Sequence, residues 1–73
     1  MMTIDKLNNI VDSLGDKKLS KAELYEIVKN YEQAFRNLAW EALENGDKKN
    51  FEKWKSRSYG FGTCEFLIDK LKD

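Results

Sequence analysis

The chain has 73 residues, of which 41% are hydrophobic and 36% are charged, and its 13 basic and 13 acidic residues leave a formal net charge of zero. A chain of this length forms one domain with a small core, and its balanced charge creates no overall field that would attract nucleic acid or an anionic membrane. With no histidine and one cysteine, Cys64, the chain lacks the ligands of a structural zinc site and cannot form an internal disulfide bond.

A short amphipathic helix is predicted over residues 3 to 14. Its apolar residues recur at intervals of three and four, which is the spacing of one helix face. These residues are Ile4, Leu7, Val11 and Leu14. Thr3 is suited to cap the start of this helix and Gly15 to end it. A helix of about three turns does not persist alone in water, so we expect it to dock on another element.

The longest predicted helix spans residues 20 to 45. It opens with a capping box, SKAE, in which the Ser20 and Glu23 side chains each accept a hydrogen bond from the backbone of the other residue. Leu19 and Leu24 stand at the positions of a hydrophobic staple. An apolar stripe then keeps helical phase and predicts the core-facing side. The stripe consists of Leu24, Val28, Tyr31, Phe35, Leu38 and Ala42.

A third helix, antiparallel to the second, is predicted over residues 47 to 71. The sequence Asn45-Gly46-Asp47 suits a left-handed C-terminal cap followed by a new N-cap, so the chain should reverse here in a tight turn. An apolar period of about 3.5 residues continues through residues 60 to 62, which favours one uninterrupted helix. A kink or break at Gly60 to Gly62 is the alternative, because each interior glycine destabilises a helix by about 1 kcal/mol.

No arrangement of side chains indicates catalysis. The sequence has no histidine, no glycine-rich phosphate loop and no glycine-flanked nucleophilic serine. Cys64 keeps helical phase with Phe61 and Ile68, which predicts a small buried side chain and not a reactive thiolate. We therefore expect a protein that is not an enzyme and uses no cofactor.

The segment from Asp12 to Glu23 partly matches a calcium-binding EF-hand loop. The ligand positions that match are occupied by Asp12, Asp16, Ser20 and Glu23. Position three is Leu14, which has no oxygen ligand, and position six is Lys17, where the motif requires glycine. Because the capping box already explains Ser20 and Glu23, we predict no metal site. A degenerate divalent-cation site is a weaker alternative.

A basic segment opens the third predicted helix, with five cations and one carboxylate. The cations alternate with aromatic residues, as in some nucleic-acid-binding proteins. They are Lys48, Lys49, Lys53, Lys55 and Arg57. On a helix they spread over most of the circumference instead of forming one stripe. We therefore expect this basic helix to pair with the acidic second helix, and nucleic-acid binding is the alternative.

Several large side chains lie away from the two apolar stripes. They are Trp40 and Leu43 on the second predicted helix, and Tyr59 and Phe66 on the third. A two-helix hairpin would leave them in water, and the short first helix cannot cover them all. Because exposed apolar patches commonly mark interfaces and Trp and Tyr are enriched at binding hot spots, we predict a partner or self-association interface here. The alternative is that Trp40 packs beneath the first helix.

The predicted fold is all-α: an antiparallel hairpin of two long helices and a short N-terminal helix, which completes a helical bundle by forming a homodimer. The predicted function is a small protein-protein interaction module, an adaptor or inhibitor, such as a phage or mobile-element accessory protein. No segment approaches the roughly 18 to 20 apolar residues of a membrane span, and the N-terminus lacks the layout of a signal peptide. We therefore expect a cytoplasmic protein that does not contact membranes.

Overall fold

The computed structural model describes residues 3 to 71, which form three helices. These are α1 (Ile4–Leu14), α2 (Lys21–Glu44) and α3 (Lys48–Asp69). Their ends fall within two residues of the predicted ends, and residues 3 to 71 contain no strand. The all-α prediction is therefore confirmed.

The helix ends are determined by local side-chain and backbone interactions. The Thr3 hydroxyl accepts a hydrogen bond from the first turn of α1, and the Asp47 carboxylate accepts one from the first turn of α3. At the start of α2, Ser20 and Glu23 form the reciprocal capping box, with both hydrogen bonds 3.1 Å long. Gly46 follows α2 with a φ of 72°, a left-handed conformation that glycine adopts without steric strain. Each helix therefore begins with a cap that the sequence indicates.

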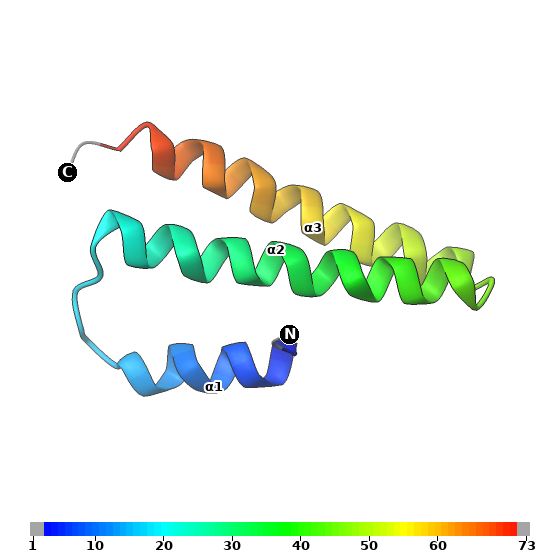
Figure 1. Cartoon of the computed structure of the whole chain (residues 1–73), viewed down its shortest axis with the longest axis horizontal. Helices are drawn as coiled ribbons and strands as arrows, with labels where there is room; N and C mark the ends of the chain where they lie inside the picture. The colour runs from blue at the N-terminus through cyan, green and yellow to red at the C-terminus, as the bar shows by residue number, and fades with distance from the viewer. Residues whose placement is uncertain (1–2, 72–73) are drawn as a thin grey trace.

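The second and third helices form an antiparallel hairpin and pack along their length (Figure 1). The first helix lies along the other edge of α2 and covers only its N-terminal half (Figure 1). Tyr31 links the two, because its hydroxyl donates a hydrogen bond to Asn8 Oδ1 at 2.6 Å. Leu7, the most buried residue of α1, retains only 2% of its surface exposed. The helix order across the molecule is therefore α1, α2, α3.

The third helix runs without a break through Gly60 and Gly62, which is the continuous helix favoured by the apolar period. Gly62 faces α2, and a Cβ at this position would lie 2.7 Å from Glu32 Oε2. One turn earlier, the buried Ser58 hydroxyl donates a hydrogen bond to the Glu32 carbonyl at 3.2 Å. Ser58 and Gly62 therefore allow close approach of the helices, whereas a Cβ at Gly60 would meet nothing within 4 Å.

The molecule is elongated and flattened. Its principal extents are 42 × 26 × 16 Å, and a single helix with its side chains is about 10 to 12 Å across. Within residues 3 to 71 six apolar residues are buried, and three of them are alanines. The six are Leu7, Ala34, Phe35, Ala39, Ala42 and Ile68.

Two expectations about α3 are wrong. Cys64 is exposed and not buried, because α3 is rotated so that its neighbour Glu65 turns toward α2 instead. The expected ion pairs between α2 and α3 are also absent among residues 3 to 71. The ion pairs that form there join residues close in sequence: Lys17 to Glu23, Arg36 to Glu32 and Lys55 to Glu52. Aromatic rings stack along much of the seam between the helices, where oppositely charged partners would otherwise meet.

Candidate interaction surface

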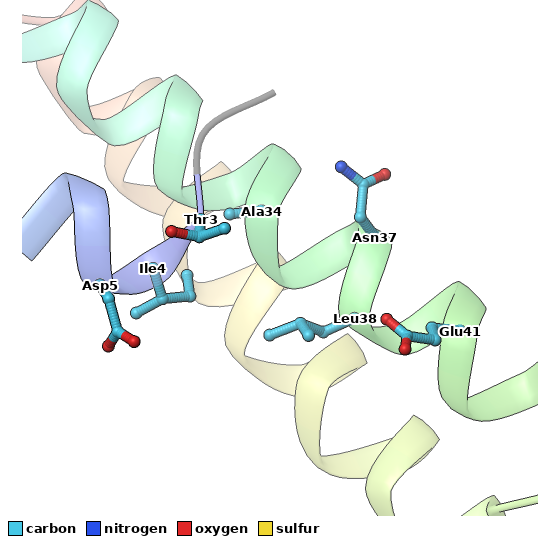
Figure 2. A pocket seen from close by; sticks show the side chains of 7 residues that line it. All are labelled: Thr3, Ile4, Asp5, Ala34, Asn37, Leu38 and Glu41. Carbon is cyan, nitrogen blue, oxygen red and sulfur yellow. The ribbon is translucent and has the colours of Figure 1, made fainter.

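A groove of about 420 Å³ lies where the start of α1 meets α2. Figure 2 shows its lining residues: Thr3, Ile4, Asp5, Ala34, Asn37, Leu38 and Glu41. Leu38 extends from α2 toward Ile4, and the Asp5 carboxylate points away from Glu41 (Figure 2). The groove therefore combines three apolar lining residues with four polar ones.

A second groove, of about 320 Å³, lies between α2 and α3. It is lined by Arg36, Ala39, Trp40, Phe51, Lys55, Ser58 and Tyr59. Trp40 comes from α2 and Tyr59 from α3, and their exposed fractions are 57% and 68%. The structure thus brings two of the predicted interface residues to one groove, with their rings largely in water.

Leu43 and Phe66 extend this surface along the hairpin. Leu43 lines a smaller groove of about 220 Å³, which shares Phe51 with the groove beside Trp40. Phe66 follows Tyr59 by seven residues, which places it two turns further along the same side of α3. Both side chains are exposed. We call these four residues, Trp40, Leu43, Tyr59 and Phe66, the aromatic face.

A ladder of stacked aromatic rings lies in the seam between α2 and α3, and the first helix packs on the side of the hairpin away from the aromatic face, which we call the reverse side. In order, the rings are Trp54, Phe35, Phe61 and Tyr31. Neighbouring ring centroids are 5.2 to 5.5 Å apart, with interplanar angles of 9° to 23°. The hydrogen bond from Tyr31 to Asn8 holds α1 on this side. The expectation that Trp40 could pack beneath α1 is therefore wrong, because α1 docks on the other side of α2.

Two carboxyl groups meet at the seam beside the aromatic face, Glu32 from α2 and Glu65 from α3. Arg36 Nη2 donates a hydrogen bond to Glu32 Oε1 at 3.1 Å. Burial raises the pKa of Glu65, and the neighbouring Glu32 carboxylate raises it further, whereas the charges of Lys29 and Arg36 act in the opposite direction. Glu65 Oε1 is buried without a hydrogen-bond partner. The charged form of Glu65 is therefore less favoured here than it is for a glutamate in water.

This pair is not among the residues predicted from the sequence, although the position of Glu65 in its helix is a signal for it. Glu65 lies four residues after Phe61 and three before Ile68, so it occupies an apolar position of the α3 stripe. A carboxyl group at an apolar position of a helix is expected to be desolvated and to have a raised pKa. Its partner on α2, Glu32, could not be identified without the register of the two helices.

The five cations of the basic segment do not form one surface. Lys53 Nζ lies 4.6 Å from the Trp54 ring centroid, and the Arg57 guanidinium lies 5.2 Å from the same ring. Lys55 instead lines the groove of the aromatic face and lies over Phe51 and Tyr59. Lys48 lines the smaller groove beside Leu43, and Lys49 is exposed. These cations thus lie on both sides of α3, over aromatic rings in three of the five cases.

The carboxylates of the partial EF-hand match lie in different elements. Asp12 lies within α1, and Asp16 follows the end of that helix. Glu23 accepts hydrogen bonds from the Ser20 backbone at 3.1 Å and from Lys17 Nζ at 3.4 Å. The Ser20 hydrogen bonds, and then the Lys17 charge, lower the pKa of Glu23. Across residues 3 to 71, no group of three or more His, Cys, Asp or Glu side chains could hold a metal ion.

No protein-family model, curated protein or solved structure matches this chain. Within the described part of the chain, no helix combines the length and apolar character needed to cross a bilayer.

Proposed function

We propose that this protein is a non-enzymatic interaction module whose aromatic face is covered by a second copy of the same chain. The observation that supports the proposal is the concentration of large exposed side chains on one side of a flattened molecule. Trp40, Tyr59 and Phe66 are 57%, 68% and 61% exposed. They belong to one side of a molecule whose shortest extent is 16 Å. Exposed apolar surface of this kind commonly marks an interface.

The accessible area supports a partner of about the size of this chain. The molecule exposes 5651 Å², whereas a compact monomer of 8.6 kDa exposes about 4,700 Å². The excess, about 950 Å², is close to the roughly 800 Å² that each partner buries in a stable protein interface. Covering the aromatic face with one further copy would therefore bring the surface per chain to that of a compact protein.

The charge distribution also favours a second copy. The chain has a formal net charge of zero, so two copies do not repel each other at long range. The rim of the aromatic face carries both signs, with Arg36 and Lys55 beside Glu32 and Glu52. A two-fold axis places each residue of one copy opposite a different residue of the other. A rim that carries both positive and negative charges can therefore be complementary to the same rim on a second copy.

Such a dimer is a bundle of α2 and α3 from each copy, with α1 on the outside. The reverse side, with α1 and the groove of Figure 2, remains accessible in it. We propose that the dimer acts as an adaptor or inhibitor by presenting two copies of this reverse side to another protein. The dimer interface is the part of the proposal that can be tested first.

The test compares Trp40→Ala with Leu67→Ala in sedimentation equilibrium. Both residues are 57% exposed, but Leu67 lies one position, or about 100°, around α3 from Phe66 and points away from the aromatic face. Truncation of a hot-spot residue costs at least about 2 kcal/mol, so Trp40→Ala should raise the dimer Kd by about thirtyfold or more. Leu67→Ala should leave it unchanged. A wild-type chain that stays monomeric, or equal effects of both variants, would contradict the proposal.

Nucleic-acid binding through Lys48 to Arg57 is the alternative function. It is less favoured because Lys55 and Arg57 lie on opposite sides of α3, over different aromatic rings. Salt dependence separates the two functions. Phosphate contacts release counterions, so nucleic-acid affinity falls steeply with salt, whereas association through the aromatic face should respond little.

A further inference from the structure

The carboxyl groups of Glu32 and Glu65 lie within the surface that the second copy would cover. Gly62, over which the Glu32 carboxylate lies, is three residues after Tyr59 and four before Phe66. Arg36, which holds Glu32, lines the same groove as Trp40 and Tyr59. Any surface that covers the aromatic face therefore also removes water from this pair.

We propose that self-association through the aromatic face is coupled to proton uptake by Glu65, so that the dimer forms more tightly at mildly acidic pH. This inference rests on the proposed function, because it concerns the regulation of the same interface. The proton would be held between the two carboxyl groups, with Glu65 as donor and the Glu32 carboxylate as acceptor.

The groups around Glu65 explain why one proton is needed. From α2, the charged groups that act on Glu65 are Glu32, Lys29 and Arg36, and α1 does not pack against α3. Arg36 forms a hydrogen-bonded ion pair with Glu32, so the charge of Glu32 is compensated. Glu65 has no such partner, and its Oε1 is buried without a hydrogen bond. A second negative charge at this seam is therefore poorly accommodated.

A second copy that covers Glu32 and Glu65 would disfavour a second negative charge at this seam still more. The Glu32 side chain retains 15% of its surface exposed in the single chain, so water still reaches the seam. When a second copy displaces this water, the charged form of Glu65 is disfavoured. The pKa of the Glu65 carboxyl group therefore rises further on association. Because association then takes up protons, the dimer Kd falls as the pH falls, by up to about tenfold per pH unit for each proton bound.

The experiment measures the dimer Kd of the full chain by sedimentation equilibrium at about pH 7.5 and about pH 5.5, both above the ordinary pKa of glutamate, so that a difference in Kd reports a raised pKa. For the wild type we expect the Kd to fall by about tenfold or more. Glu65→Gln keeps a hydrogen-bond donor without the charge, so its Kd should be low and independent of pH. Glu41→Gln, on the α1 side of α2, should keep the wild-type pH dependence and serves as the matched control.

Calorimetric dilution in two buffers of different ionisation enthalpy counts the protons directly and does not depend on a variant. Proton release on dissociation of the wild type, absent in Glu65→Gln, supports the coupling. A wild-type dimer with the same Kd at both pH values, or an unchanged pH dependence in Glu65→Gln, would overturn the coupling and leave the dimer intact. Monomers at every pH would overturn the proposed function itself.

Discussion

The two interior glycines of α3 provide a matched pair of substitutions that tests the register of the hairpin. Both lie in helical backbone, and neither has a positive φ. Alanine stabilises a helix interior by about 0.8 to 1 kcal/mol relative to glycine. A Cβ at Gly60 would meet nothing within 4 Å, so Gly60→Ala should show this full gain. At this chain length it corresponds to a rise in Tm of about 4 to 8 °C.

At Gly62 the same substitution meets an opposing effect. The new Cβ would lie 2.7 Å from Glu32 Oε2, so the carboxylate must move away from its position beside α3. The Glu32 side chain is flexible, so the displacement is tolerated, but its geometry with Arg36 and Glu65 changes. We expect Gly62→Ala to show less than half of the Gly60→Ala gain, or a small loss.

The assay is thermal and urea unfolding of both variants, followed by circular dichroism at one protein concentration because the chain is proposed to dimerise. Equal stabilisation by the two substitutions would show that Gly62 does not face Glu32. A loss of stability in Gly60→Ala would show that α3 is not a regular helix at this point.

Further predictions concern the other contacts that hold the fold together. Leu7→Ala should destabilise the protein by about 2 to 5 kcal/mol and release α1, seen as a lower urea midpoint and reduced helical signal; an unchanged midpoint would show that α1 is not anchored there. Ser20→Ala should cost about 1 kcal/mol of unfolding free energy, and no change in the urea midpoint would contradict the capping box. Because folding raises the pKa of Glu65, its contribution to stability is complete below its unfolded pKa and is lost as the pH rises through the folded pKa. Urea midpoints measured across pH should therefore show a fall toward neutral pH that Glu65→Gln removes; the same fall in that variant would contradict the assignment.

The helices and their ends were predictable because local interactions determine them. The Ser20 and Glu23 capping box and the turn at Gly46 depend on residues a few positions apart. The apolar period also indicated correctly that α3 continues through Gly60 and Gly62. Exposure of the four residues of the aromatic face followed from the same helical phases.

The rotation of the helices about their axes was not predictable with the same accuracy. The apolar period placed Cys64 in the core, whereas α3 turns Glu65 toward α2 and leaves Cys64 in water. The sequence also did not predict on which edge of α2 the first helix docks. This edge depends on the tertiary contacts of Leu7 and on the hydrogen bond between Tyr31 and Asn8. These features depend on contacts between residues distant in sequence, which periodicity does not report.

The most direct test of the proposed dimer is the fluorescence of Trp40 as the protein is diluted. Trp54→Phe removes the other tryptophan and keeps an aromatic ring to stack on Phe35. From about 1 mM to about 1 µM, the emission of Trp40 should move to longer wavelength and become more accessible to a soluble quencher as the dimer dissociates. Emission typical of a solvent-exposed indole at every concentration would contradict the claim that a second copy covers the aromatic face.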